Sequence, residues 1–536
     1  MNKKWQVYNV NEAQVEEIIN NNNVNKLIAT ILSNRGITNQ KDIDIFLNPT
    51  RQDFHNPYQM PDMEIAVERI IKAIENKEKI IIYGDYDVDG ITSITVLKSF
   101  LKDRGIDAKY YIPNRIEEGY GLNIPAVEKI AKEKYDLMIT VDCGISCIEE
   151  IRRANELGVQ TIVTDHHEVG ESLPEALAVV DCKRKDNKYP FRELAGVGVV
   201  FKLIQALSIK LNLEEKEYLK YLDIVCIGTI SDIVPLVDEN RVISKLGLML
   251  VKQTKNMGLR SILNASGYKK IDSGAISFGV APRLNACGRM GHADEALKLF
   301  LSNNVNEVYD LTVSLNDFNR LRQETEKHIY EDAIKQIEEN NGDKNRAIIL
   351  AGNNWHHGVI GIVASKITEI YFKPSILLCL EDGIGKGSGR SIPGFDLHDA
   401  LTKCQSLLEK FGGHAMAIGI TIKQENIEQI INKMKEFEID KSQYNSLIEE
   451  IKNKIKYSIE FLYNNYEKNN KNLETDRTYK KIIDNLISME EFEEIYSYKF
   501  YEDIRYKEGS ISHCGYPDYM WQSGAERNIY IVSSNT

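Results

Sequence analysis

The spacing of apolar residues changes between two periods from residue 62 to residue 181. Short apolar runs predict buried strands at 79–84, 107–112, 136–142, 159–164 and 177–181. Segments with the helical period lie between them and predict helices at 62–77, 91–104, 123–134 and 146–157. Strands and helices that alternate at this spacing are typical of a parallel sheet in an α/β fold.

A long charged helix and a second, smaller α/β unit are predicted next. Residues 304–340 have a helical pattern without Gly or Pro, and such a helix commonly bridges two domains. Two apolar strands and a helix follow, and the glycine-rich stretch GIGKGSGRSIPGFD at 383–396 is expected to be a loop. The resulting domains are 1–60 (N-terminal extension), 61–303 (parallel-sheet domain), 304–340 (connecting helix), 341–440 (smaller α/β domain) and 441–536 (mainly helical).

Composition limits the possible functions only loosely. The 536 residues carry a net charge of −12, so a polyanion would have to be bound by a local basic groove or through a metal ion. The eight cysteines are scattered without a CxxC pair, which favours reduced thiols. No apolar run approaches about 18 residues, and the first twelve residues are polar. We therefore expect a cytoplasmic protein without a signal peptide or membrane span.

The stretch KIIIYGDYDVDGITS at 79–93 has the strongest chemical signal. A predicted strand ends in three alternating carboxylates, Asp85, Asp87 and Asp89, directly before a helix. Carboxylates this close raise one another's pKa unless a cation neutralises them, so the loop predicts half of a divalent-metal site. An EF-hand is excluded because its twelfth position is Val96 in place of Glu. A solvated acidic turn is the alternative that this stretch alone leaves open.

Metal-ligating residue types also follow two later strands. Asp142 ends the run at 136–142, and Asp165, His166 and His167 follow the run at 159–164. Asp232 stands in the otherwise apolar stretch 221–236, where a carboxylate is costly unless it is paired or coordinated. Each has an ordinary alternative as a helix cap, a surface pair or a salt bridge. Their joint position at one edge of a parallel sheet favours a metal centre.

Several glycine-rich stretches offer groups that suit phosphate recognition. Arginine binds phosphate through two parallel hydrogen bonds, and glycine lets a backbone N–H approach an anion closely. Residue 380 is Leu, so the stretch around Lys386 lacks the spacing of a P-loop, and a plain flexible hairpin stays an alternative there. The candidates are Arg283 and Arg289 in a turn-rich loop at 281–294, Ser388, Arg390, Gly413 and His414.

Taken in order, these motifs resemble the DHH phosphoesterase superfamily and, within it, the RecJ family of single-stranded-DNA-specific exonucleases. The resemblance covers residues from about 25 to 435. It is carried by the strings YGDYDVDGITS, EEGYGLN, VDCGIS, TDHHE, LAGVGVVFKL, GTISDIVPL, PRLNACGRM, WHHGVIGIVASK, GSGRS and FGGHAMAIG. It implies a DHH domain joined by the long helix to a DHHA1 domain. It also implies 5′ to 3′ hydrolysis of single-stranded DNA to mononucleotides in repair and recombination.

The resemblance also implies roles for the candidate residues. Asp89 and Asp142 would bridge two Mn²⁺ or Mg²⁺ ions, His167 would face the scissile phosphate, and Asp85 would position water. Carboxylates with one imidazole suit these ions independently of the family. The implied metal ligands are Asp87, Asp89, Asp142, His166 and Asp232.

The chain departs from the family pattern at its C-terminal end, where 441–536 lack the signature of an OB-fold domain. This leaves open a DHH-type phosphodiesterase that acts on short oligonucleotides or cyclic dinucleotides. A non-catalytic binding protein on the same fold is the second alternative. The expected partners are single-stranded DNA, a single-strand-binding protein and a helicase, and the resemblance implies a monomer.

Overall fold

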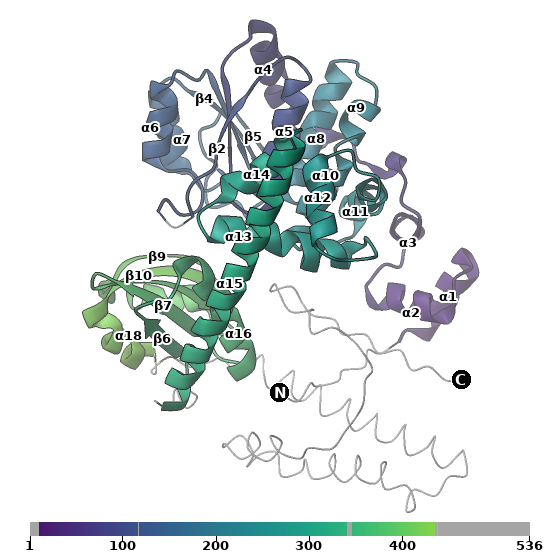
Figure 1. The fold of residues 1–536 in the computed structure, drawn as a ribbon. Coiled ribbons are helices and arrows are strands. Elements are labelled where there is room, and N and C mark those ends of the chain that lie inside the picture. The colour runs from purple at the N-terminus through teal and green to yellow at the C-terminus, as the bar shows by residue number, and fades with distance from the viewer. Residues whose placement is uncertain (1–9, 116, 340–345, 435–436, 438–536) are drawn as a thin grey trace, which may run out of the picture.

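The computed structural model describes residues 10–115, 117–339, 346–434 and 437 (Figure 1). Its first sheet has five parallel strands in the order β2-β1-β3-β4-β5. They are β1 (Ile80–Gly84), β2 (Lys109–Tyr111), β3 (Leu137–Val141), β4 (Gln160–Asp165) and β5 (Ala178–Asp181). The predicted parallel sheet is therefore confirmed, with all five of its strands.

Helices cover both faces of this sheet, which is why its strands are apolar throughout. All five residues of β1 are buried, with Ile80 and Ile82 facing one layer and Ile81 and Tyr83 the other. The first layer contains α4 (Met63–Asn76), α5 (Val88–Lys102) and α8 (Gly196–Lys210). The second contains α6 (Ile124–Lys132) and α7 (Ile148–Glu156).

A helical region leads from the first sheet to the second. Its elements are α9 (Lys216–Leu219), α10 (Leu222–Ser231), α11 (Asp238–Val251), α12 (Met257–Ala265), a π-helical turn (Ala275–Val280), α13 (Ala281–Arg289), α14 (Ala293–Leu301) and α15 (Val305–Glu339). Figure 1 shows α15 running from the first domain to the second, as predicted for the long helix. Arg283 and Arg289 lie in α13, so the prediction of a turn-rich loop was wrong. Ala281, Leu284 and Cys287 bury one side of α13, and this packing overrides the local Gly and Asn signals.

The second domain has a mixed sheet in the order β6-β7-β8-β10-β9, in which only β6 and β7 are parallel among the described strands. Its elements are β6 (Ile348–Gly352), α16 (His357–Tyr371), β7 (Ser375–Glu381), β8 (Ile384–Arg390), α17 (Leu397–Thr402), β9 (Leu408–His414), β10 (Ala417–Lys423) and α18 (Ile427–Met434).

The predicted loop at 383–396 is in large part strand β8, so that prediction was also wrong. The glycines of β8 serve close packing. A Cβ on Gly387 would lie 2.4 Å from the Leu378 side chain, and one on Gly389 would lie 2.7 Å from Ile418. Glycine in a strand interior marks such close approach as well as flexibility.

The N-terminal part adds α1 (Glu12–Asn22), α2 (Lys26–Asn34) and α3 (Gln40–Leu47), followed by short 3₁₀ turns at Arg51–Asp53 and Pro57–Gln59. The Nε of Arg241 in α11 donates to the carbonyl of Phe46 at 2.8 Å, which ties α3 to the first domain. No helix among the described residues is long and apolar enough to span a bilayer. The expectations for 441–536 lie outside the described residues.

A buried ion pair joins three segments behind the first sheet. Lys202 of α8 and Glu239 of α11 are both fully buried, and their charged atoms lie 2.8 Å apart. The backbone of His55 completes the contact, because its carbonyl accepts from Lys202 at 2.7 Å and its N–H donates to Glu239 at 2.9 Å. The Tyr189 hydroxyl also donates to Glu239.

We expect Lys202→Met to destabilise the protein strongly, because it leaves the Glu239 carboxylate buried without its cation. Breaking one side of a buried pair costs about 3–5 kcal/mol of the free energy of unfolding. Urea denaturation of this variant tests the expectation. The control is Lys210→Met, a substitution on the same helix. The Lys210 side chain is 42% exposed, so its loss should change stability by less than about 0.5 kcal/mol. Equal effects of the two substitutions would contradict the assignment.

Candidate metal centre

The acidic loop after β1 is shaped by a helix cap and a glycine. Asp87 caps α5, and its Oδ1 accepts hydrogen bonds from the N–H groups of Asp89 at 2.9 Å and Gly90 at 3.1 Å. A Cβ on Gly90 would lie 2.4 Å from the carbonyl oxygen of Asp85, so only glycine fits there. The loop folds tightly enough to bring Asp85, Asp87 and Asp89 to one place.

The start of α8 holds the Asp89 carboxylate. Its two oxygens accept from the N–H groups of Gly196 at 2.6 Å and Val197 at 2.9 Å. Free N–H groups and the positive end of the helix dipole both favour a carboxylate there. A Cβ on Gly228 of α10 would lie 3.0 Å from Asp89 Oδ1 and 2.2 Å from the Thr92 hydroxyl, so glycine allows α10 to approach.

Asp142 enters the same space from the end of β3. Its backbone is left-handed, with φ of 59°, and its N–H donates to the Thr164 carbonyl at 3.1 Å. Aspartate tolerates this conformation better than most residues. A Cβ on Gly196 would lie 2.6 Å from Asp142 Oδ1. The glycine at the start of α8 therefore lets Asp142 and Asp89 converge.

His166 lies at the point where these carboxylates meet. Its Nε2 is 3.1 Å from Asp142 Oδ1, 3.7 Å from Asp232 Oδ2 and 3.8 Å from Asp89 Oδ2. The Nε2 atom is buried but forms no hydrogen bond to any described residue. The imidazole ring is also hydrogen-bonded to the backbone of Leu194. A buried nitrogen that faces three carboxylates without bonding to them has the arrangement of a ligand to a shared cation.

Three overlapping groups of potential ligand atoms make up the site. Within each group the atoms lie within 4.8 Å of one another. The groups are Asp85, Asp87 and Asp142; Asp89, His166 and Asp232; and Asp142, His166 and His167. The structure thus brings together every residue for which the sequence predicts a place at the metal centre.

His167 belongs to the third of these groups and is oriented by its neighbours. Its Nδ1 lies 2.7 Å from Asp165 Oδ1, and Asp165 also accepts from the N–H groups of Ile145 and His166. Burial lowers the pKa of His167, but Asp165 outweighs burial and raises it to about 9. The His167 ring therefore carries a proton at neutral pH and can donate it to an oxygen at the site.

Burial and mutual repulsion raise the pKa values of the converging carboxyls. Burial, followed by the charge of Asp87, raises the pKa of Asp89 to about 7. Burial, followed by the charge of Asp89, raises that of Asp232 to about 9 and that of Asp142 well above its ordinary range. Burial lowers the pKa of His166 to about 3, which leaves its imidazole neutral. Acids that need a counter-charge and a neutral imidazole fit a divalent cation.

A group of arginines faces the acidic loop from α13 and the second domain. Burial, and then the charges of Arg115, Arg322 and Arg390, lower the pKa of Arg289 to about 9, while Asp87 opposes this. Arg390 donates to the Ser388 hydroxyl at 2.9 Å, and Arg289 donates to the carbonyl of Gly358, at the start of α16, at 3.3 Å. These guanidinium groups repel one another, and a bound phosphate group would balance their charge.

The other predicted phosphate-binding residues differ in position. His414 on β9 and Arg390 on β8 both pair with Ala417 of β10, so the two share one row of the sheet. Gly413 is required there, since its φ is +132° and a Cβ would lie 2.3 Å from the Ala417 carbonyl. By contrast, all three guanidinium nitrogens of Arg283 donate within the first domain, to Asn316, Gly279 and Ala265. This geometry does not support phosphate binding by Arg283.

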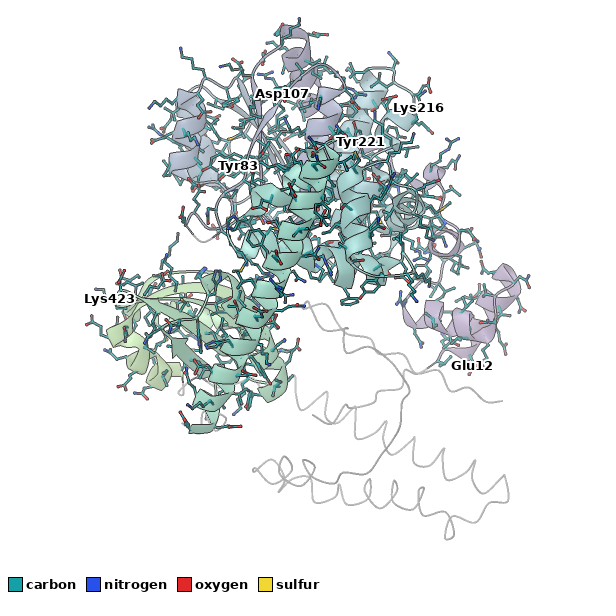
Figure 2. The ribbon with its side chains drawn as sticks, in the orientation of Figure 1. Glu12, Tyr83, Asp107, Lys216, Tyr221 and Lys423 are labelled. Atoms are coloured by element: carbon teal, nitrogen blue, oxygen red, sulfur yellow. The ribbon has the colours of Figure 1, made fainter. Side chains whose placement is uncertain are left out.

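Sequence reasoning assigned no role to four residues that the structure brings to the site or to the loop beside it. Arg115 follows β2 and acts on Asp85, and Tyr120 lies with its hydroxyl 3.2 Å from both the Asp142 carbonyl and His167 Nδ1. Tyr83, labelled in Figure 2, holds this loop by donating to the Gly121 carbonyl at 3.0 Å. Arg322 lies on α15. The motif EEGYGLN indicates the loop that contains Tyr120 and Gly121. No periodic pattern in the sequence indicates Arg115 or Arg322.

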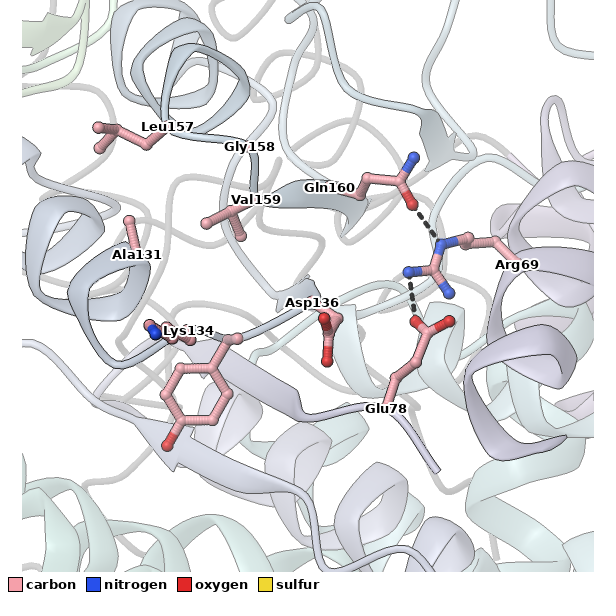
Figure 3. A pocket seen from close by; sticks show the side chains of 10 residues that line it. Arg69, Glu78, Ala131, Lys134, Asp136, Leu157, Gly158, Val159 and Gln160 are labelled. Atoms are coloured by element: carbon pink, nitrogen blue, oxygen red, sulfur yellow. Dashed lines mark hydrogen bonds and ion pairs between the residues drawn. The ribbon is translucent and has the colours of Figure 1, made fainter. Parts of the chain in front are cut away.

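A pocket of about 420 Å³ lies at the opposite edge of the first sheet, where β3 and β4 begin (Figure 3). Arg69 spans it, donating to Gln160 and Glu78 at 2.6 Å each. The metal-ligand candidates follow the other ends of these strands. This pocket is therefore separate from the candidate metal centre.

Comparison with known proteins gives matches over most of the chain. Models of the DHH family N-terminal domain and of the DHHA1 domain match residues 79–229 and 344–440. The chain is 39% identical to the single-stranded-DNA-specific exonuclease RecJ of Bacillus subtilis, over 81% of this chain and 55% of that protein. The RecJ protein of Haemophilus influenzae is 34% identical, over 73% of this chain and 71% of its own length.

The fold is similar to RecJ crystal structures from Thermus thermophilus. The structure in complex with Mn²⁺ has a TM-score of 0.70 and 31% identity, covering 81% of this chain and 62% of that chain. The structure in complex with Mg²⁺ has a TM-score of 0.65 and 29% identity, covering 81% and 60%. The chain thus spans little more than half the length of some relatives and over two thirds of others.

Without metal, the protein should lose stability as the pH rises from about 6 to 9. The raised pKa values of about 7 for Asp89 and about 9 for Asp232 mean that the folded state retains protons the unfolded state has released. Their contribution is complete below the ordinary carboxyl pKa and is lost as the pH passes through the two folded-state values. Melting temperatures measured in chelator across this range test the sign.

Saturating Mn²⁺ should remove this decline, because the cation takes over the role of the protons. Asp232→Asn should flatten it even in chelator, since the amide does not titrate. A metal-free melting temperature that stays constant or rises between these pH values contradicts the description of the site.

Proposed function

The chain belongs to the RecJ family of single-stranded-DNA-specific exonucleases, and we propose on this premise that it hydrolyses single-stranded DNA from the 5′ end to mononucleotides, in DNA repair and recombination. The observation that carries the proposal is the convergence of three aspartates on the unpartnered Nε2 of His166. A site for divalent ions beside cations that can hold phosphate is suited to phosphodiester hydrolysis.

The metal ligands in this proposal are Asp87, Asp89, Asp142, His166 and Asp232. Asp142 belongs to two of the three groups of ligand atoms and Asp89 to the group that contains His166 and Asp232. Both carboxylates would be shared by the two Mn²⁺ or Mg²⁺ ions. Such ions, when bound, polarise the phosphoryl oxygen and lower the pKa of a bound water. The oxygen-rich donor set with one imidazole suits these ions better than zinc.

Two residues beside the ligands have separate proposed roles. Asp85 is 3% exposed, and its Oδ1 has no hydrogen-bond partner among the described residues, so it can accept a proton or hydrogen bond from an attacking water. Protonated His167, held by Asp165, can donate to an oxygen of the scissile phosphate.

The substrate phosphates are proposed to lie between the first domain and β8 of the second. Arg289, Arg390, Ser388 and His414, with Gly413 allowing close approach, would hold them, and Arg115 joins this group. A flexible single strand enters a site bounded by two domains more readily than a duplex. We keep the predicted boundaries for the parts of the chain that form this site, which are 61–303, 304–340 and 341–440.

The proposal also includes the wider setting of the protein. Single-stranded DNA is its substrate, and a single-strand-binding protein and a helicase are its proposed partners. The seven described cysteines are buried, and none of them forms a disulfide with another, which fits a reducing cytoplasm. A monomer is proposed as the active form.

Asp89→Asn should abolish the release of nucleotides from a long single strand. Loss of groups that merely support metal ligands already costs roughly 10–100-fold, so loss of a ligand shared by two ions should cost more. The measurement uses Mn²⁺ and single strands labelled at the 5′ or the 3′ end. Early release of mononucleotide from the 5′ label is expected.

Asp107→Asn is the matched control, because Asp107 is an exposed acid of the same domain that pairs with Lys98 and Lys109 (Figure 2). It should retain wild-type activity. Rapid cleavage of dinucleotides without turnover of long strands would replace the proposal with a short-oligonucleotide phosphodiesterase. Metal binding without any turnover would indicate a binding protein.

A further inference from the structure

A lysine and a glutamate face each other beside the metal centre, at the β5 edge of the sheet. Asp165 of β4 pairs with Asp181 of β5, so the segments that follow these strands leave the sheet side by side. The Lys183 ammonium lies 3.2 Å from Glu168 Oε1, and the two side chains are 18% and 83% exposed. Neither residue has a role in the site described above.

The backbone of Lys183 is firmly held while its ammonium group reaches the surface. Its N–H donates to Asp181 Oδ1 at 2.6 Å, and its carbonyl accepts from Arg192 at 2.6 Å. The charge of Lys183 acts on both Asp232 and His166. The ammonium group therefore lies within electrostatic reach of the metal centre, on a backbone that is held in place.

The order of the strands gives this lysine a definite direction from the centre. Arg115 follows β2, the acidic loop follows β1, Asp142 follows β3, His166 follows β4 and Lys183 follows β5, and the sheet order is β2-β1-β3-β4-β5. Arg115 and Lys183 thus lie on opposite sides of the carboxylates, and Arg115 is one of the arginines that act on Arg289. A strand with its scissile phosphate at the centre would have a cation on each side.

The two sides differ in how far they are closed. On the arginine side, the Arg289 guanidinium is buried against the start of α16 in the second domain. The closed arginine side therefore suits the single 5′-terminal nucleotide that is released. On the other side Glu168 is largely exposed, so a long chain can continue into solvent.

We propose that Lys183 binds the phosphate that follows the scissile phosphate on its 3′ side in single-stranded DNA, and that Glu168 occupies this position in the absence of substrate. The inference rests on the proposed exonuclease function. The Glu168 side of this ion pair is largely exposed, so a phosphate group can displace its carboxylate from Lys183 at low cost. Lys183 then acts as a substrate-binding residue and not as a catalytic one.

Lys183→Gln tests this site through substrate length. Its KM for a long single strand should rise roughly threefold to tenfold, the share of one phosphate contact, and the slope of log KM against log salt should decrease by about 0.7. The KM for a 5′-phosphorylated dinucleotide should stay unchanged, because this substrate has no phosphate beyond the scissile bond. The affinity for Mn²⁺ should also stay unchanged.

Three further variants sharpen the test. Lys185→Gln, an exposed lysine of the same loop, should change neither KM, whereas Lys183→Arg should retain most of the affinity for the long strand. Glu168→Gln should lower the KM for the long strand at low salt, because it removes the competing carboxylate. These effects on KM should leave kcat close to that of the wild type.

Equal losses on both substrates together with weaker Mn²⁺ binding would overturn the proposal, because Lys183 would then only support the metal centre. An unchanged KM for the long strand would overturn it as well. Turnover of the long strand by the wild type tests the proposed function separately. Its absence overturns both inferences, whereas its presence with an unaffected Lys183→Gln variant overturns only the lysine site.

Discussion

The repulsion among buried carboxylates is the constraint on which the rest of this structure depends. Asp85, Asp89 and Asp142 are each no more than 3% exposed, and their charges meet at one edge of the sheet. The fold lowers the cost of this crowding in two ways. The N–H groups at the start of α8 hold Asp89, and glycines at 90, 196 and 228 keep side chains out of the space that the carboxylates need. A divalent cation supplies the remaining neutralisation, which ties folding in this region to metal binding.

A second group of like charges lies opposite the first. The positive charges of three other arginines repel the buried guanidinium of Arg289, which lies against α16. Its charge is therefore poorly balanced, as are the charges of the carboxylates that it faces. The helix α15 places the arginines opposite the carboxylates, because it starts in the first domain and packs against α16 and β6 in the second. A phosphodiester with metal ions would satisfy both groups in the proposed function, because the ions would bind the carboxylates and the phosphate oxygens would bind the arginines.

Much of the first domain could be predicted from the sequence, and less of the second. The strands are recognisable because both faces of a parallel sheet are apolar. The ends of these strands predict that Asp87, Asp142 and His166 lie together. The prediction failed where packing reverses a local signal. In β8, glycines that suggest flexibility are required by Leu378 and Ile418, and α13 forms despite its Gly and Asn. Arg115 and Lys183 could not be assigned because only strand order brings them to the site.

The most direct test of the central claim is the anomalous scattering of manganese in crystals of the full chain grown with Mn²⁺. The account predicts two ions roughly 3.5–4 Å apart, with Asp89 and Asp142 each contacting both and His166 Nε2 coordinating one of them. A single ion without a bridging carboxylate would contradict the two-metal site. Ions bound elsewhere, with His166 still unpartnered, would contradict the assignment of this edge of the sheet as the metal centre.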